Sequence, residues 1–334
     1  MVGYVRAAAS SLASKVEFLR SLCGPGDEAI ETHFAWVFLV GGHAWKLRKP
    51  VRRDSMDYGT LEARRLDSFD EVRLNRRLAA DVYLRAVPLS IDREGHLQLD
   101  GPGEAVDWLV CMRRLDRRRQ LDAVLAQGAP ASDALDGIAH LLANFYRTAA
   151  ATLPGAEPLA DRLGQQVERN REALAGARLP AADELAEAQQ RYLASCGELL
   201  RQRVNAGCIV EGHGDLRPEH VFLNEPPAII DCLEFDRDLR ILDRAEELCF
   251  LELECARLGF PAAGRRIREH CLRELGDEAP ASLLDFYRSH RAATRAKIYV
   301  WRSGEPDGKD PAHWMRQAAS YAECALAEAR RAIA

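Results

Sequence analysis

A change in residue pattern, about a third of the way along the 334-residue chain, is the feature that most limits how this sequence can fold. Up to about residue 112, short apolar runs separated by turn residues predict a strand-rich region with one helix. Beyond residue 116, amphipathic segments of helix length follow one another with few interruptions. The chain is about twice as long as a typical domain. We therefore predict an α+β fold of two lobes: residues 1–112, with a core from about residue 28, form a small antiparallel-sheet lobe, and residues 113–334 form a larger, mainly helical lobe.

Two hairpins organise the predicted sheet. Residues 35–40 form an apolar run of strand length, Gly41-Gly42 supplies the positive φ angles of a tight turn, and residues 43–48 return. A second hairpin is predicted over 82–99, and a further strand over 108–112. Between the hairpins, residues 60–79 have helical spacing, with an apolar face formed by Leu61, Leu66, Phe69, Val72 and Leu78.

The rest of the chain is predicted to be mostly helical. Helices are expected over 121–127, 132–149 with Ser132 as N-cap, 159–175, 181–205, 242–258, 262–275, 281–301 and 312–333. A loop at 152–158 separates two of them, and short strands are expected at 208–211 and 228–231.

Composition argues against several classes of protein. The net charge of -5 and the pI near 6.0 lack the basic excess of nucleic-acid-binding surfaces, so no nucleic acid partner is expected. No run of ~18 apolar residues could cross a membrane, and the charged stretch Met1–Arg20 lacks the apolar core of a signal peptide. The nine cysteines form no Cys-x-x-Cys pair, so we expect free thiols in a reducing cytoplasm.

Two aspartates are candidate catalytic groups. Asp215 lies in the segment His213–Leu223, after a short strand, and Asp231 ends the next predicted strand. Carboxylates on consecutive loops can converge, so that one accepts a proton from a hydroxyl and the other holds Mg²⁺, as phosphoryl transfer requires. For either aspartate alone, a loop cap or a strand end is the simpler explanation. A third possibility makes His213, Asp215 and His220 the ligands of a hydrolytic metal centre, although their spacing fits no compact helix-face site.

The sequences His-Gly-Asp-Leu at 213–216 and Ile-Ile-Asp-Cys-Leu-Glu-Phe at 229–235 resemble the aminoglycoside phosphotransferase family of protein-kinase-like small-molecule kinases. Further segments resemble an uncharacterised bacterial branch of that family: residues 31–39, 45–50, 73–78 and 81–84. The resemblance spans roughly residues 28–260. It implies a bilobal protein-kinase-like fold, with a nucleotide-binding first lobe and a helical second lobe that carries the catalytic and metal-binding loops.

The resemblance implies a nucleotide-binding set in the first lobe. Lys46 matches the lysine that contacts the α- and β-phosphates of ATP, and Glu71 matches the glutamate that pairs with this lysine. Met112, at the seam between the lobes, completes the cofactor-binding residues. Taken without the resemblance, Lys46 could extend its ammonium to the surface, and Glu71 could belong to a solvated helix face.

In the second lobe, Asp215 matches the family's catalytic aspartate, which orients and deprotonates the acceptor hydroxyl, and Asp231 matches the magnesium ligand. Asp243 matches a helix-start aspartate that braces the catalytic loop, and His213 is expected to orient that loop. His220 stands where the family usually has asparagine as a second metal ligand, and Mg²⁺ prefers oxygen to imidazole nitrogen. Either His220 binds the metal directly or through a water, or that metal position is altered, or activity is weakened.

These assignments predict an ATP- and Mg²⁺-dependent enzyme, an ATP:alcohol phosphotransferase that transfers the γ-phosphate to a hydroxyl of a small-molecule acceptor. The alternative is a nucleotide-binding pseudokinase or regulatory protein, suggested by His220 and by the lack of glycine in the phosphate-covering turn at 31–35. Several acids would suit a cationic acceptor, or are ordinary solvated charge: Glu234, Asp236, Asp238, Glu246 and Glu247. No Gly-x-x-x-x-Gly-Lys-Ser/Thr motif occurs, so no P-loop kinase domain is expected in this chain.

Overall fold

The computed structural model describes residues 11–53, 56–149, 157–305 and 310–334. It divides into two compact units. The first unit comprises Met1–Gln120 and Asn224–Leu239, and the second comprises Leu121–Leu223 and Arg240–Ala334.

This division differs from the predicted boundary at residue 112 in two ways. The first unit continues to Gln120, and it also takes residues 224–239 from the middle of the predicted helical lobe. The cause is backbone hydrogen bonding, because the N–H groups of Ile229, Asp231 and Cys232 all donate to groups of the first unit. Local pattern could not reveal this, since the partners lie about 150 residues earlier in the chain.

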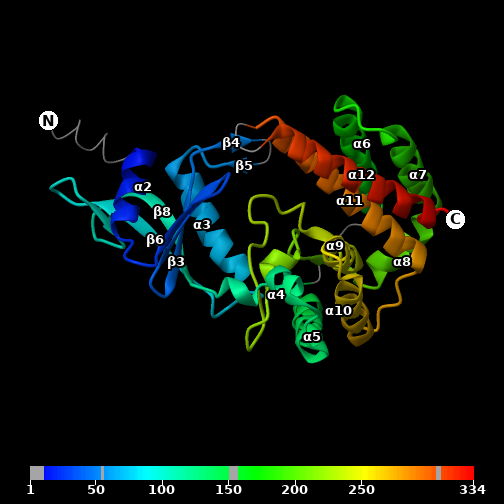
Figure 1. The fold of residues 1–334 in the computed structure, drawn as a ribbon, viewed down its shortest axis with the longest axis horizontal. Coiled ribbons are helices and arrows are strands. Elements are labelled where there is room, and N and C mark those ends of the chain that lie inside the picture. Colours follow the sequence, from blue (N-terminus) through cyan, green and yellow to red (C-terminus); the bar gives the residue numbers. More distant parts are fainter. Residues whose placement is uncertain (1–10, 54–55, 150–156, 306–309) are drawn as a thin grey trace. The chain divides into compact units, whose positions relative to one another are not determined.

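The first unit is built on a six-stranded antiparallel sheet with the order β1-β2-β3-β8-β6-β7 (Figure 1). Its strands are β1 (Glu28–Glu31), β2 (Ala35–Val40), β3 (His43–Arg48), β6 (Tyr83–Ile91), β7 (Leu97–Leu99) and β8 (Glu104–Arg113). Both predicted hairpins are present, but Gly41 alone of the Gly41-Gly42 pair has a positive φ angle, 53°. A short ribbon of β4 (Arg52–Arg53) and β5 (Met56–Asp57) follows β3.

One face of this sheet packs against α2 (Leu12–Ser21), which lies beside it in Figure 1. Buried apolar side chains of the helix and of four strands form the core of the unit: Val16, Leu19, Phe38, Leu47, Val87, Leu89, Leu109 and Cys111. Side chains alternate between the two faces of a strand. Lys46 and Arg48, on either side of the core residue Leu47, therefore point to the opposite face.

The opposite face is covered by α3 (Leu61–Asn75), whose N-cap Thr60 accepts a hydrogen bond from the backbone of Ala63. Contrary to the prediction, α3 does not bury its apolar side, since Leu66 and Phe69 are 52% and 45% exposed. It buries a mainly polar set instead, including Arg64, Asp67, Ser68, Glu71 and Asn75. The reason is that these charged groups find partners on the sheet, which allows them to be buried.

The second unit is mainly helical. Its helices are α4 (Leu121–Gln127), α5 (Ser132–Thr148), α6 (Glu157–Gly176), α7 (Ala182–Ser195), α8 (Gly197–Asn205), α9 (Arg244–Arg257), α10 (Pro261–Glu274), α11 (Ala281–Ser303) and α12 (Pro311–Ala332). Two short strands, β9 (Ile209–Glu211) and β12 (Ile241–Asp243), pair antiparallel. A large core cluster joins residues of α6, α7, α9, α11 and α12.

Most predicted helices are present, with changes at their ends. The helix predicted over 181–205 is broken at Cys196 into α7 and α8, and the one predicted from Leu242 begins at Arg244, because residues 241–243 pair with β9. Ser132 is the first residue of α5, and the N-cap position is taken by Ala131. Residues 152–156 of the loop predicted at 152–158 lie outside the described residues, and α6 begins at Glu157.

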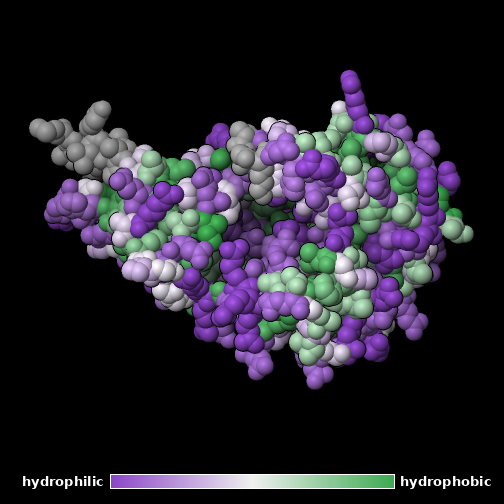
Figure 2. All heavy atoms as spheres, viewed as in Figure 1, coloured by the Kyte–Doolittle hydropathy of each residue, from purple (hydrophilic) through white to green (hydrophobic). Residues whose placement is uncertain are grey.

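All nine cysteines are free thiols. Among the described residues, none of the helices combines the length and the hydropathy that a membrane span needs. On the face shown in Figure 2, apolar side chains are scattered among charged ones.

The packing of α3 predicts that two of its leucines contribute differently to stability. Leu74 is buried, whereas Leu66 is half exposed. We expect Leu74→Ala to lower the free energy of unfolding by about 2–5 kcal/mol, because it opens a cavity in the core. Leu66→Ala should change it by less than about 0.5 kcal/mol. Urea unfolding followed by circular dichroism measures both, and equal losses would contradict the described packing of α3.

Candidate functional site

The ammonium of Lys46, on β3, is held between two carboxylates. Nζ lies 2.8 Å from Oε1 of Glu71 on α3 and 3.0 Å from Oδ1 of Asp231. Burial and the neighbouring Arg48 act to lower the pKa of Lys46, but the charges of Asp231 and Glu71 outweigh them and raise it. The structure thus brings three predicted site residues together within one unit, and it keeps the ammonium charged.

Arg48 forms a second centre of ion pairs on the same face of β3. Its Nε donates to Oδ2 of Asp67 at 2.7 Å, and Nη2 donates to Oε2 of Glu71 at 2.7 Å and also to Glu234. Tyr58 adds a hydrogen bond from its hydroxyl to Glu234, at 3.2 Å. Oxygen atoms of Asp67, Glu71 and Glu234 lie within 4.8 Å of one another, a spacing that a metal ion could bridge. The guanidinium of Arg48 already bonds to all three, so this group needs no metal.

Four carboxylates of the combined cluster contact Lys46 and Arg48: Asp67, Glu71, Asp231 and Glu234. Burial raises the pKa of Glu234 to about 7, and the charges of Glu71 and Asp67 add to this effect against the opposing effect of Arg48. Burial also raises the pKa of Asp67. These two carboxyl groups therefore take up protons more readily than exposed ones do.

Asp231 is the member of this cluster that can reach a ligand, since its side chain is 48% exposed. Its φ angle of 63° is in the left-handed region, which aspartate tolerates better than most residues. The backbone is held there because the N–H of Asp231 donates to the hydroxyl of Tyr83 at 3.1 Å, and that of Cys232 donates to Oδ1 of Asn75 at 2.8 Å. A hard carboxylate oxygen of this kind fits Mg²⁺, which is often held by one or two carboxylates together with substrate phosphates.

Met112 lies near the end of β8, opposite Ala44 of β3 and Tyr83 of β6. Its side chain is almost fully buried. The next residue remains tied to the sheet, because the N–H of Arg113 donates to the carbonyl of Val82 at 2.8 Å. Contact between Met112 and a nucleotide stays a prediction.

Asp215 belongs to the second unit, where it follows β9. Nε of Arg217 lies 3.0 Å from Oδ2 of Asp215. Burial acts to raise the pKa of Asp215, but the charges of Arg217, His220 and Arg295 outweigh it and lower the pKa to about 2. The carboxylate is therefore ionised at neutral pH.

Both ring nitrogens of His220 have partners within the second unit. Nδ1 lies 2.9 Å from the carbonyl oxygen of Asp215, and Nε2 lies 3.1 Å from Nη2 of Arg217. A carbonyl only accepts and a guanidinium only donates, so the neutral ring carries its proton on Nδ1. A metal bond to either nitrogen requires one of these contacts to break. In this arrangement His220 supports the Asp215 loop.

A buried glutamate that the prediction did not identify braces the same loop. Glu247, on α9, accepts hydrogen bonds from the backbone N–H groups of His213, at 2.8 Å, and Gly214, at 2.6 Å. A Cβ atom on Gly212 would lie 2.7 Å from Oε2 of this glutamate, so a larger residue here would displace the carboxylate from this position. His213 is fully buried, and its Nδ1 accepts a hydrogen bond from the N–H of Asp215 at 3.3 Å.

Asp243 lies at the start of a helix, as expected. It caps α9 through the N–H of Ala245, at 2.8 Å, and its carboxylate pairs with Arg203 at 2.6 and 2.7 Å. The hydroxyl of Tyr287 donates a further hydrogen bond, at 3.0 Å. Glu247, one helical turn later, contacts the Asp215 loop directly. Asp243 anchors the start of the helix that carries this glutamate.

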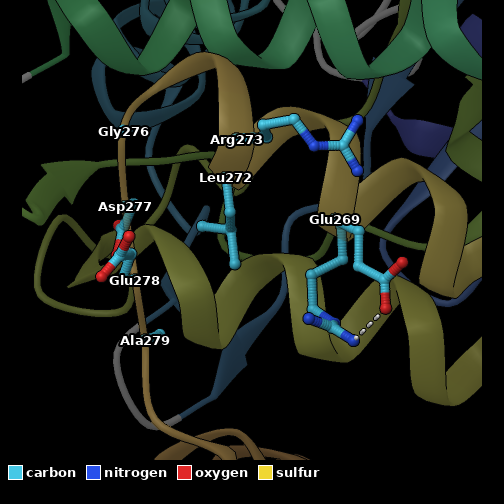
Figure 3. A pocket seen from close by; sticks show the side chains of 8 residues that line it. Glu269, Leu272, Arg273, Gly276, Asp277, Glu278 and Ala279 are labelled. Atoms are coloured by element: carbon cyan, nitrogen blue, oxygen red, sulfur yellow. Dashed lines mark ion pairs between the residues drawn. The ribbon is translucent and has the colours of Figure 1, made fainter.

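A pocket of about 360 Å³ lies elsewhere on the second unit (Figure 3). It is lined by residues of α10 and of the segment 276–279 that follows it. Its aspartate, Asp277, already pairs with Arg203 and Arg244. None of the predicted site residues lines this pocket, so it does not change the assignment of the site.

Sequence inspection missed Arg48, Asp67 and Glu234 as members of the Lys46 cluster, although a signal was present. Arg48 is two residues from Lys46 on a strand, and Asp67 is four residues from Glu71 on a helix, spacings that place each pair on one face. The strand face with two cations could therefore pair with the helix face that carries two acids. Glu234 had no such signal, because its loop takes its position from tertiary contacts.

Comparisons with known proteins define the fold. No family model matches the chain. Uncharacterised proteins of Mycobacterium tuberculosis and Mycobacterium bovis are 35% identical to it over 294 residues, which cover 85% of this chain and 57% of each relative. The chain therefore spans little more than half the length of these curated relatives.

Three solved structures are similar over almost the whole chain. A choline/ethanolamine kinase family protein of Mesorhizobium loti has a TM-score of 0.53 at 15% identity, with 98% of this chain and 99% of that chain covered. A choline kinase of Cryptosporidium parvum has 0.55 at 12%, with 97% and 96% covered. A thermostable mutant of an aminoglycoside phosphotransferase has 0.55 at 12%, with 95% and 98% covered. These similarities confirm the predicted α+β fold, which is the protein-kinase-like fold of these small-molecule kinases.

The raised pKa of Glu234 predicts a pH-dependent stability. An unfolded glutamate titrates near 4.5, and the folded one near 7, so the folded state binds the proton more tightly. Its contribution to stability is therefore full below pH 4.5 and is lost as the pH rises through 7. We expect the unfolding free energy of the wild type relative to Glu234→Gln to fall by roughly 3 kcal/mol between pH 4.5 and pH 8.

Urea unfolding at a series of pH values checks this expectation. Glu62→Gln is the matched control on exposed α3 surface, where the carboxylate pairs with Arg65. A pH-independent difference between the wild type and Glu234→Gln would show that Glu234 is ionised in the folded protein throughout this range.

Proposed function

We propose, on the basis of the protein-kinase-like fold, that this protein is a small-molecule kinase that transfers the γ-phosphate of ATP to a hydroxyl of its acceptor with the help of Mg²⁺. The observation that carries the proposal is the buried ammonium of Lys46 between Glu71 and the half-exposed Asp231. A lysine that served only stability would be an unusual choice in this interior, because burial of its charge is costly. A lysine that binds phosphate needs an ammonium that stays charged and points in a fixed direction, which the two carboxylates provide.

The first unit is proposed to hold the nucleotide. Glu71 fixes the direction of the Lys46 ammonium, which then donates to phosphate oxygens, and Met112 lines the nucleotide site. Asp231 would hold Mg²⁺, which supplies positive charge to the phosphates as charge develops during transfer. Displacement of the Lys46–Asp231 contact by phosphate would leave the Lys46–Glu71 pair intact, because the two carboxylates contact the ammonium separately.

Asp215 is proposed as the catalytic residue that binds the acceptor hydroxyl. Its pKa of about 2 makes it ionised but weakly basic, so it orients the hydroxyl before bond formation and receives the proton as the oxygen becomes acidic. This order suits a loose transition state, in which the attacking oxygen needs little early deprotonation. Glu247 and His213 position the loop, and His220 is proposed to do the same.

A second candidate function is a pseudokinase that binds the nucleotide without transferring phosphate. The observation that favours it is the engagement of both nitrogens of His220, at the position where asparagine is expected as a metal ligand. Under this alternative, purified protein binds Mg²⁺-ATP in a thermal-shift titration but releases no ADP with any acceptor in a broad panel. His220→Asn should then create or increase turnover.

We also propose a cytoplasmic location and a small molecule, rather than a nucleic acid or a membrane, as the partner. The nine free cysteines support the location. The net charge of -5 supports the partner.

Substitution of Asp215 separates its catalytic role from nucleotide binding. We expect Asp215→Asn to lower kcat by about 10²-fold or more, because the amide cannot accept the proton, while Kd for Mg²⁺-ATP changes less than about twofold. Lys46→Ala should weaken nucleotide binding instead. Asp183→Asn, at an exposed position on α7, is the control. Calorimetric titration and a coupled ADP-release assay measure these quantities, and an unchanged kcat for Asp215→Asn would overturn the assignment.

A further inference from the structure

One face of α11 extends from the Asp215 loop and carries arginines. Nη1 of Arg291 lies 3.3 Å from the carbonyl oxygen of Gly214, which places α11 directly against the loop. Arg295 and Arg302 follow four and eleven residues later, spacings that return to nearly the same face of a helix. The helix therefore presents successive guanidinium groups along a line that starts at the proposed catalytic loop.

Arg295 is nine-tenths buried, with 6% of its surface exposed, and its guanidinium is only partly bonded. Nη2 donates to the hydroxyl of Tyr299 at 2.9 Å, but Nε has no hydrogen-bond partner among the described residues. The closest carboxylate, that of Glu254, is 3.9 Å from Nε and already accepts two hydrogen bonds from the hydroxyl of Tyr321, at 2.8 and 2.9 Å. A buried N–H without a partner costs free energy, which an acceptor atom in this position would recover.

Arg302 has aromatic neighbours but no carboxylate. Its guanidinium carbon lies 5.2 Å from the ring centre of Trp314 and 6.0 Å from that of Tyr299. Within the described part of the chain, no acidic side chain pairs with it. Partial burial and the positive charges of Arg295 and Arg217 lower the pKa of Arg302, against the opposing effects of Tyr299 and Asp215.

The carboxylates of this region are committed to other partners. Asp215 and Glu219 both pair with Arg217, and Glu254 takes its hydrogen bonds from Tyr321. Glu246 and Glu247, which sequence inspection suggested as an acidic wall, are buried; Nε of Arg291 lies 2.9 Å from Glu246. Arg302 is therefore the arginine of this region that has no carboxylate partner among the described residues, which suits an anionic group on the acceptor.

We infer that the acceptor carries an anionic group, a carboxylate or a phosphate, which binds Arg302 and the free Nε–H of Arg295. The inference rests on the kinase function proposed above and deepens it by naming the substrate class. Guanidinium groups suit this task because their planar N–H donors match carboxylate and phosphate oxygens. The rings of Trp314 and Tyr299 hold Arg302 in place by cation–π contact.

Calorimetric titration tests the inference. It measures the binding of four small alcohols of different charge, without nucleotide and at constant ionic strength. The probes are glycerol 3-phosphate, glycerate, glycerol and choline. We expect the wild type to bind one or both of the anions at least tenfold more tightly than glycerol and choline. Arg302→Gln should lose tenfold or more of this affinity, Arg302→Lys should retain part of it, and Arg330→Gln, an exposed control on α12, should retain all of it. Preference for the phosphate over the carboxylate, or the reverse, identifies which anion fits.

Failure of the inference and failure of the kinase proposal give different results. Three results would each overturn the inference: equal binding of choline and the anions, absence of anion binding, or anion affinity that is unchanged in a folded Arg302→Gln variant. With any of them, intact Mg²⁺-ATP binding and ADP release would keep the kinase function. Anion binding that depends on Arg302, in a protein that binds no ATP, would support the anion site and overturn the kinase proposal.

Discussion

The buried ion pairs of Lys46 and Arg48 connect the parts of the first unit that are farthest apart in sequence. They join β3, α3 and the segment 224–239 through Glu71, Asp67, Asp231 and Glu234. Charges in a low-dielectric interior are stable only when paired, and removal of one partner of a buried pair commonly costs about 3–5 kcal/mol. The cluster therefore fixes which face of α3 turns inward, even though this leaves Leu66 and Phe69 in contact with water.

The same principle positions the Asp215 loop in the second unit. A buried carboxylate, that of Glu247, collects the backbone N–H groups of His213 and Gly214, and Gly212 leaves the space for it. Asp243 anchors the beginning of the helix that carries Glu247. Each unit thus uses interior carboxylates to hold a loop, and each loop presents one partly exposed aspartate, Asp231 or Asp215. The two aspartates differ in environment: Asp231 shares Lys46 with the carboxylate of Glu71, and Asp215 pairs with Arg217.

That difference in charge separates two chemical tasks in the proposed reaction. The carboxylates of Asp231 and Glu71 hold the charged ammonium of Lys46, and Asp231 is proposed to hold the metal cation. Arginines around Asp215 lower its pKa and leave Arg302 without an acidic partner in the described residues. The solved structures with similar folds include a choline kinase, and the similarity establishes the fold without identifying the acceptor.

Local pattern predicted most of the helices and strands of this protein, but not, for example, α2, β1, β4 or β5. Alternation and turn residues predicted the hairpins over 35–48 and 82–99, helical spacing predicted nearly every helix, and the resemblance in the segments around Lys46, Asp215 and Asp231 predicted the fold. Hairpins and helices depend on residues close together in the chain, because hydrophobic periodicity and turn residues determine them.

Tertiary structure decided what those elements bury and which charges meet. Hydropathy assigned the wrong inward face to α3, because the partners of its acids lie on β3 and in a segment more than 150 residues later. It also could not show that residues 224–239 belong to the first unit, that Glu247 holds the Asp215 loop, or that no carboxylate pairs with Arg302 among the described residues. Ion pairs form between groups that are close in space, and their strength depends on burial. The tertiary structure is therefore needed to identify them.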